Sequence, residues 1–383
     1  MSAQLSAADL VQLVRRVFRP GPLDRGLAIL VDLPDARLPD DEDWRARRTM
    51  AAAWAAALDG AKAELGLERV TLAWYPNVGG NNADLPADCA PGAPGAVLHH
   101  ADDLAGLAAL PFAELFDTHS LILAPTELST TAPLKVAARS HAMRAATMPG
   151  FLESMVPALR IDYGEVNRRV DLLKELVDKA LGAVIHFRAE GADHRLHLDL
   201  RHRTGHASGG LFPVNGVAGN LPSGETYIVP YEGELAQDPT RTAGTIPVQF
   251  GDEVVVYEVR GNRAVAVLSD GPESEREAAY LRHEPAYANI AELGLGVLGD
   301  FGLAPTGTIL LDEKLGLHVA FGRSDHFGGQ VGPRDFSSPD AVVHIDRVYI
   351  PEVQPKVEVV TLNLHLPEGE RTVMRDGAWT DVF

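Results

Sequence analysis

Five acidic and histidine side chains in the C-terminal half of the chain are of the types that bind catalytic metal ions. Each stands beside glycine turns or in a short apolar run; they are Glu225, Glu292, His318, His344 and Asp346. Carboxylate oxygens and imidazole nitrogens together suit zinc, cobalt, manganese or iron(II), and the ligands of catalytic metal sites are usually scattered along a sequence. These residues are the candidate ligands of a metal centre.

The local sequence around each candidate also allows a simpler interpretation. His344 and Asp346 are two apart in a predicted strand over residues 341–350, so both leave the same face and can bind one ion, but a polar strand face explains them as well. His318 lies in an apolar run, where a hydrogen-bonded core histidine is the alternative. Glu292 also interrupts an apolar run, and a buried carboxylate must be paired or coordinated. Glu225 follows a Pro and Gly turn, where a solvated acid is common.

The elements that must position these residues fall into two patterns. In the first half, helices are predicted over residues 7–18, 44–65 and 163–181, and strands over 27–33, 70–75 and 121–124, with a long surface loop over 77–95. From residue 183 onward, short alternating runs such as 194–201 and 253–268 predict strands. We therefore expect an α/β N-terminal domain with a mostly parallel sheet over residues 1–184, and a β-rich α+β domain carrying the metals over 185–383.

Composition excludes several classes of function. The formal net charge of −19 disfavours nucleic acid as a partner and favours cationic substrates such as amines. The single cysteine, Cys89, leaves no internal disulfide and no thiolate cluster for a metal, and we expect it to be a buried apolar residue. No run approaches the roughly 20 apolar residues of a membrane span. A cytoplasmic protein without a membrane partner is the expectation.

Other motifs point to no second site. The histidine-rich segment 194–206 alternates leucine with polar residues, which is typical of a half-buried strand. Gly79-Gly-Asn-Asn lacks the lysine and hydroxyl of a phosphate-binding loop, and no Gly-x-Ser-x-Gly sequence indicates a serine hydrolase. A nucleotide cofactor is not expected.

The segments that contain the five candidates, taken in order, resemble those of the thermophilic metallo-aminopeptidases, the aminopeptidase T family. They are Asn-Leu-Pro-Ser-Gly-Glu-Thr-Tyr-Ile-Val-Pro at 220–230, Gly-Thr-Ile at 244–246, Asn-Ile-Ala-Glu-Leu-Gly at 289–294, Asp-Glu-Lys-Leu-Gly-Leu-His-Val-Ala-Phe-Gly at 312–322, and His-Ile-Asp at 344–346. A weaker resemblance at 132–138, 148–150 and 162–163 extends the match to roughly residues 120–350.

The resemblance implies that all five candidates bind two neighbouring divalent ions, zinc, cobalt or manganese, with one carboxylate bridging them. It also implies hydrolysis of an amide, such as removal of the N-terminal residue of a small peptide or cleavage of another small amine-bearing substrate, and it suggests a homodimer. Glu225 and Lys314 are then candidate catalytic groups. For Lys314, a group that stabilises the oxyanion and a salt bridge on a turn remain alternatives.

One position departs from the family pattern. The better-known peptidases of this family have a catalytic tyrosine seven residues after the histidine that matches His318, and this chain has Asp325 there. Asp325 and His326 are the candidates to stabilise the transition state in its place. The surrounding sequence, Arg-Ser-Asp-His-Phe-Gly-Gly at 323–329, resembles a less studied branch of the family.

The chain also resembles, more distantly, the 2,5-dihydroxypyridine 5,6-dioxygenases. Those enzymes hold one iron through two histidines and one aspartate at the positions of 292, 344 and 346, with histidine in place of Glu292. The glutamate here, together with Glu225 and His318, favours a two-metal hydrolase. The alternatives are a mononuclear iron(II) ring-cleaving dioxygenase and a metal-bound protein without catalytic activity.

Overall fold

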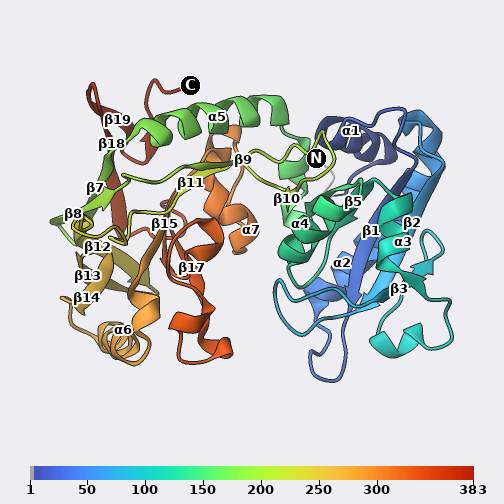
Figure 1. The fold of residues 1–383 in the computed structure, drawn as a ribbon, viewed down its shortest axis with the longest axis horizontal. Coiled ribbons are helices and arrows are strands. Elements are labelled where there is room, and N and C mark those ends of the chain that lie inside the picture. Colours follow the sequence, from blue (N-terminus) through green and yellow to red (C-terminus); the bar gives the residue numbers. More distant parts are fainter. Residues whose placement is uncertain (1–3) are drawn as a thin grey trace. The chain divides into compact units, whose positions relative to one another are not determined.

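The computed structural model describes residues 4–383 and divides into two compact units by its internal packing (Figure 1). The first contains residues up to 164 and the segment 209–223, and the second contains 165–208 and 224–383. The sequence predicted one boundary near residue 185, so the observed division differs in two places. It assigns nearly all of the predicted helix over 163–181 to the second unit, and it assigns the later segment 209–223 to the first.

The first unit contains one seven-stranded sheet with helices packed on it. Its strand order is β10-β6-β5-β1-β2-β3-β4, and the first five strands of this order are parallel. The strands are β1 (Gly26–Leu33), β2 (Arg69–Pro76), β3 (Asp88–Gly92), β4 (Leu110–Pro111), β5 (Leu121–Ala124), β6 (Arg144–Thr147) and β10 (Ala218–Asn220). The α-helices are α1 (Ala7–Phe18), α2 (Glu42–Ala61), α3 (Phe112–Thr118) and α4 (Thr131–Ser140).

Local sequence explains the central elements of this unit. Ser6 and Asp9 form a capping box that starts α1, and the Asp41 side chain caps α2. Every residue of β1 is buried, as expected for a parallel strand covered on both faces. Residues of α3 and α4 pack in one apolar cluster with alternate residues of β1, including Ala28 and Leu30.

The expected loop over residues 77–95 contains a strand. β3 pairs antiparallel with β2, and Cys89 and Ala90 are buried there. The sequence failed to predict this strand because Pro91 and Gly92 are poor strand formers. Gly92 fits because the Trp74 indole lies against it: a Cβ atom at this position would lie 2.6 Å from Trp74 Nε1. The predicted helix over 44–65 also ends earlier, in the 3-10 helix η1 (Lys62–Leu65).

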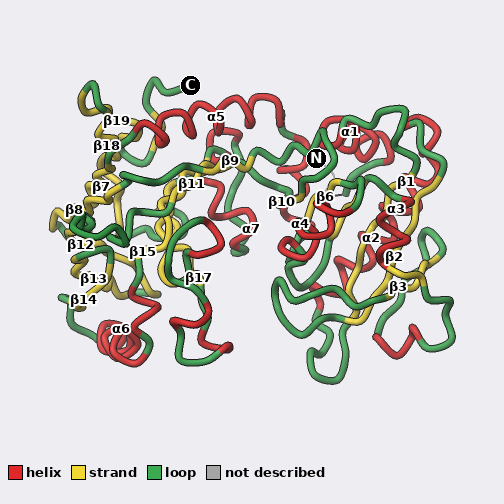
Figure 2. The backbone as a smooth tube through the Cα atoms, viewed as in Figure 1, coloured by secondary structure: helices red, strands yellow, loops and turns green. Residues whose placement is uncertain are grey.

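The second unit contains two antiparallel sheets (Figure 2). The five-stranded sheet has the order β17-β16-β15-β11-β9, and the eight-stranded sheet has the order β14-β13-β12-β8-β7-β18-β19-β20. The first is built from β9 (His206–Ser208), β11 (Glu225–Ile228), β15 (Ile290–Gly296), β16 (Leu317–Gly322) and β17 (His344–Tyr349). The second is built from β7 (Gly182–Ala189), β8 (Ala192–Asp199), β12 (Ala243–Phe250), β13 (Glu253–Arg260), β14 (Arg263–Val267), β18 (Val357–Leu366), β19 (Gly369–Arg375) and β20 (Ala378–Trp379).

Helices complete this unit. They are α5 (Tyr163–Lys179), α6 (Pro272–His283) and the short α7 (Ile309–Asp312), with 3-10 turns that include η6 (Glu313–Leu315) and η7 (Asp325–Phe327). The hydroxyl of Thr226 in β11 donates a 2.6 Å hydrogen bond to the Val170 carbonyl in α5. This contact explains why α5 packs with the second unit, although the sequence pattern placed it in the first.

The core of the second unit lies between its two sheets. Phe321 of β16 packs on Tyr257 of β13, with ring centroids 5.3 Å apart, and Tyr349 of β17 packs on Phe187 of β7 at 4.7 Å. Because side chains alternate along a strand, the residues next to Phe321 and Tyr349 point to the opposite face of the five-stranded sheet. That opposite face carries the polar residues described below.

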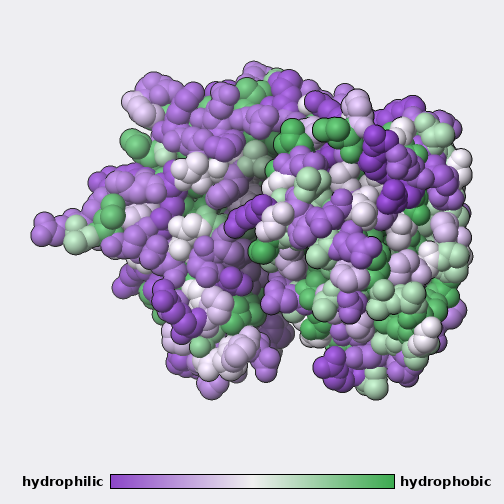
Figure 3. All heavy atoms as spheres, turned by 45° about the vertical axis from the view of Figure 1, so that its right-hand side comes forward, coloured by the Kyte–Doolittle hydropathy of each residue, from purple (hydrophilic) through white to green (hydrophobic). Residues whose placement is uncertain are grey.

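The chain is thus a mixed α/β protein with several sheets. Within the described residues, none of the helices has both the length and the apolar character needed to cross a bilayer. The face drawn in Figure 3 is mostly hydrophilic, with scattered apolar residues, as expected for a chain with a net charge of −19.

Candidate metal centre

All five candidate ligands lie on one face of the five-stranded sheet. Strand pairing sets Glu292 opposite Ala320 and Ala320 opposite Asp346, while His318 pairs with Gly294 and Glu225 with Gly296. Paired residues in antiparallel strands point to the same side, and so do residues two apart along one strand. The side chains of four strands therefore converge above one patch of sheet, away from the apolar core.

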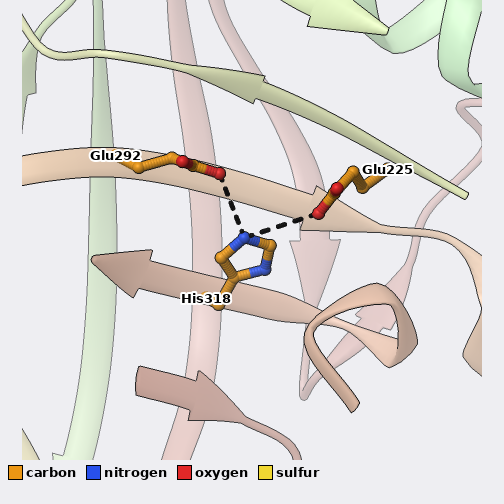
Figure 4. Close-up of side chains that lie close together, drawn as sticks. All are labelled: Glu225, Glu292 and His318. Carbon is orange, nitrogen blue, oxygen red and sulfur yellow. Dashed lines mark hydrogen bonds and ion pairs between the residues drawn. The ribbon is translucent and has the colours of Figure 1, made fainter. Parts of the chain in front are cut away.

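Glu225, Glu292 and His318 form the first ligand group of this patch (Figure 4). The Nε2 atom of His318 lies 3.3 Å from Glu292 Oε1 and 3.7 Å from Glu225 Oε2. All three residues are buried, and His318 is only 1% exposed. Three ligand atoms of the correct chemistry thus face a common point.

Glu292, His344 and Asp346 form the second group. The Nε2 atom of His344 lies 3.3 Å from Glu292 Oε2 and 3.3 Å from Asp346 Oδ1. The other ring nitrogen, Nδ1, donates a 2.7 Å hydrogen bond to the Arg323 carbonyl. Because a carbonyl only accepts, Nδ1 carries a proton, and in the neutral ring the lone pair of Nε2 is then free to bind a metal ion held among these carboxylates.

The two groups share Glu292, and its two oxygens serve different histidines. Oε1 faces His318, whereas Oε2 faces His344. Among the described residues, no group of three ligand atoms within 4.8 Å of one another contains both histidines. The arrangement therefore consists of two adjacent ligand sets that share Glu292, and Asp346 Oδ1 of the second set also lies 4.0 Å from His318 Nε2 of the first.

The spacing and chemistry of these donors fit divalent metal ions. Two ligand atoms bound at about 2.1 Å to one tetrahedral ion lie about 3.4 Å apart, close to the 3.3 Å separations found here. Three carboxylates in one patch, those of the buried Glu225 and Glu292 and of the partly buried Asp346, repel one another unless cations lie between them. Protons on the histidines or bound metal ions can supply that positive charge.

Titration behaviour reflects the same crowding. Burial alone would lower the pKa of His318, but its hydrogen bond to Glu292 and the charges of Asp346 and Glu292 outweigh it and raise the pKa to about 9. The pKa of His344 is likewise raised, against the effect of burial, chiefly by Asp346. Burial would raise the pKa of Glu292, but hydrogen bonds from both histidines lower it. A metal ion must displace protons from these rings in order to bind.

Gly294 makes room for the first group. Its position pairs with His318 across the sheet, and a Cβ atom there would lie 1.8 Å from His318 Nε2. Only a residue without a side chain leaves room on β15 for the His318 imidazole. This is the physical reason for the glycine that follows Glu292 by two residues.

Lys314 lies at the edge of the patch on η6, and its side chain is fully buried. Its ammonium lies 3.3 Å from Glu225 Oε1 and also pairs with Glu313. Burial would lower the pKa of Lys314, but the two carboxylates raise it, so the side chain is charged. Lys314 thus forms salt bridges on a turn, and these contacts hold its ammonium beside the candidate ligand Glu225.

Asp325 and His326 differ in their relation to the patch. The Asp325 carboxylate pairs with Arg323 Nε at 2.6 Å and has no ion pair with any of the five candidates among the residues described. The His326 ring packs edge-on against His344, with centroids 5.3 Å apart, and burial lowers its pKa to about 4. The structure therefore brings His326 beside the patch and leaves the Asp325 carboxylate paired elsewhere.

Two further residues at the patch were absent from the sequence prediction. Burial, partly offset by the Lys314 charge, raises the pKa of the Glu313 carboxyl to about 8. Tyr227 follows Glu225 by two residues and points to the same face. The period of two would have indicated Tyr227, whereas no local signal distinguishes Glu313 from an ordinary acid on a turn.

Comparisons with known proteins show the fold. The structure of 2,5-dihydroxypyridine dioxygenase from Pseudomonas putida KT2440 matches with a TM-score of 0.60 and 16% identity, over 98% of each chain. Wild-type AmpT from Thermus thermophilus, an aminopeptidase T, matches with a TM-score of 0.54 and 15% identity, over 97% of this chain and 99% of that one. No protein-family model matches the chain, and no curated protein sequence matches it significantly.

These two likenesses establish a fold shared with both of the families that the sequence resembles. At 15% and 16% identity they do not distinguish hydrolase from oxygenase. That choice depends on the side chains of the patch.

Proposed function

We propose that this protein is a hydrolase that uses two divalent metal ions, and that it acts like an aminopeptidase on small peptides or other amine-bearing amides. Glu225, Glu292 and His318 would hold one ion, and Glu292, His344 and Asp346 would hold the other. The observation that carries this proposal is the division of the two Glu292 oxygens between His318 and His344.

This division favours two ions over one. A single ion bound at Oε2 with His344 and Asp346 would leave Oε1, His318 and Glu225 as a second set of buried donors, whose negative charge only Lys314 and a proton on His318 would offset. Burying a carboxylate is strongly unfavourable unless cations compensate its charge. A second ion in the neighbouring ligand set would replace the proton on His318 and complete that compensation.

The side chains around the ligands suit amide hydrolysis. When bound, a pair of divalent ions supplies a water of lowered pKa and polarises a carbonyl group. Lys314 holds Glu225 in place through its 3.3 Å ion pair and adds a fixed positive charge beside the developing oxyanion. The excess of acidic residues in the chain attracts a substrate with a free ammonium group.

A mononuclear iron(II) ring-cleaving dioxygenase is the second candidate. The likeness to the Pseudomonas putida dioxygenase, with its TM-score of 0.60, favours it. In that case Glu292, His344 and Asp346 would hold the single iron. A metal-binding protein without catalytic activity is the third candidate.

Metal analysis combined with two activity assays separates the three. The purified protein is analysed for metals, then assayed with dipeptides and aminoacyl anilides, and separately with 2,5-dihydroxypyridine in an oxygen electrode. Two zinc, cobalt or manganese ions per chain together with release of an N-terminal residue support the proposal. One iron per chain with oxygen uptake supports the dioxygenase, and bound metal without either activity supports the third candidate.

A further inference from the structure

The polar face of the five-stranded sheet continues beyond the candidate ligands to a tyrosine. Tyr227 lies two residues after Glu225 on β11 and pairs across the sheet with Gly294. Gly294 also pairs with His318 on its other side. The Tyr227 side chain therefore rises from the same face as Glu225 and His318, in the row that contains His318.

Neighbouring rings fix the orientation of this tyrosine. The Tyr227 ring stacks on His206, with centroids 5.0 Å apart and an interplanar angle of 23°. It also contacts Phe327, with centroids 4.7 Å apart, and Phe327 and His206 lie beside each other at 6.3 Å. His206 is itself held, because its Nε2 lies 3.1 Å from the Phe327 carbonyl oxygen. A ring packed in this way presents its hydroxyl in one direction, at little further cost in conformational entropy.

The hydroxyl of Tyr227, which is partly buried, makes no hydrogen bond to any residue that the structure describes, although fully buried tyrosines of this unit do. Tyr257 and Tyr287, for example, both donate to Glu277. A phenol, with an ordinary pKa of about 10, keeps its proton near neutral pH. The hydroxyl is thus a hydrogen-bond donor that no described residue occupies, on the face that carries Glu225 and His318.

We propose that Tyr227 is a further catalytic residue, whose hydroxyl donates a hydrogen bond to the substrate carbonyl oxygen as that oxygen becomes an oxyanion. This assignment rests on the proposed hydrolytic function. The water oxygen bonds to the carbonyl carbon, and the π electron pair moves to the carbonyl oxygen that Tyr227 faces. The C–N bond then breaks, the pair returns to form the new carboxyl group, and a proton from the water passes to the leaving amine. Tyr227 keeps its own proton throughout.

The test compares Tyr227→Phe with Tyr280→Phe. Both substitutions remove one hydroxyl and keep the ring. Tyr280 belongs to α6, stacks on Tyr287 and lies outside the patch. For Tyr227→Phe we expect kcat for an aminoacyl anilide to fall by about 10²–10³-fold, with KM and metal content nearly unchanged, because one oxyanion donor is lost. Binding of an aminophosphonic acid, which carries a tetrahedral anionic group, should weaken by a comparable factor. Tyr280→Phe should behave as wild type in both measurements.

Each other outcome overturns the assignment. Wild-type kcat in Tyr227→Phe shows that the hydroxyl does not act in the reaction, while the hydrolytic function stands. Loss of metal from Tyr227→Phe, or a raised KM with unchanged kcat, shows a role in holding the site or the substrate. Absence of hydrolysis by the wild-type protein overturns the proposed function, and this assignment with it.

Discussion

Each unit of the molecule buries acidic residues on a sheet, and the surroundings of these acids differ. In the first unit, Asp32 at the end of β1 is 1% exposed, and its carboxylate accepts hydrogen bonds from the amides of Glu127 (2.8 Å) and Leu128 (3.0 Å) and from Trp44 Nε1 (3.2 Å). In the second unit, Glu292 is 4% exposed, and both its oxygens face imidazole nitrogens beside further carboxylates.

The difference in hydrogen-bond partners distinguishes Asp32, a structural acid, from Glu292, a candidate metal ligand. The N–H groups around Asp32 are permanent donors, so its carboxylate is satisfied by the fold itself, although burial raises its pKa to about 6. The groups around Glu292 are satisfied only when protons or cations lie between them. Burial alone therefore does not identify a metal ligand, whereas burial among other acceptors does.

Replacing Glu292 should produce the largest effect. In Glu292→Gln an amide replaces the carboxylate that both ligand sets share, so we expect metal content to fall from two ions to one or none per chain. Hydrolysis should fall by more than about 100-fold, since even residues that only orient metal ligands contribute about 10–100-fold. Elemental analysis and peptide assays measure both quantities.

The matched control is Glu277→Gln, in the same unit. Glu277 is also 4% exposed, but it accepts hydrogen bonds from Tyr257 and Tyr287 and faces no candidate ligand. This variant should keep both metals. If Glu292→Gln also retains two ions, the proposed bridging role is wrong.

A smaller effect is expected from Gly294→Ala, which replaces none of the candidate ligand residues. The added methyl would lie 1.8 Å from His318 Nε2, so the imidazole must move. We expect loss of the ion held by Glu225, Glu292 and His318, retention of the other, and activity reduced by tens of times, within the range of about 10–100-fold for disturbed ligand orientation. Gly60→Ala on α2, where an added Cβ meets nothing within 4 Å, is the control. Two tightly bound ions in Gly294→Ala would contradict the steric argument.

Replacing Asp32 should change stability and leave metal binding intact. In Asp32→Asn one of the two amides that now face carboxylate oxygens must face an NH2 group. We expect the free energy of unfolding to fall by about 1–3 kcal/mol, with unchanged metal content. Chemical denaturation and elemental analysis test the two halves of this prediction. Loss of metal in this variant would remove the distinction between the two acids.

The last prediction is a pH dependence of stability that is confined to the metal-free protein. The pKa of His318 is about 9 in the folded chain, against an ordinary value of about 6.5. Its proton therefore stabilises the fold fully below about pH 6.5, and this contribution is lost as pH rises to about 9. Urea unfolding with a chelator should show stability falling across that window, and the metal-loaded protein should show no such fall. Identical pH profiles for the two forms would mean that metal does not replace this proton.

Much of the fold could be predicted from local sequence. Helix α1 was predicted over the correct residues from the helical spacing of its apolar residues, and Ser6 and Asp9, which cap it in the structure, are a second local signal. Strand β1 was recognisable as an apolar run that only Asp32 interrupts. The strand β3 and the membership of α5 were not, because both depend on partners distant in the sequence, Trp74 for β3 and Thr226 for α5.

For the site, the sequence by itself determined which side chains have metal-binding chemistry, and that His344 and Asp346 leave the same face of one strand. Tertiary structure alone decided that Glu225, Glu292 and His318 share that face. The pairing of β15 with β16 shifts register between Ile290 and Glu292, and a shift of one residue moves every later side chain to the other face of the sheet. Cross-strand hydrogen bonds and core packing set that register, so no spacing within β15 could reveal that Glu292 lies between His318 and His344.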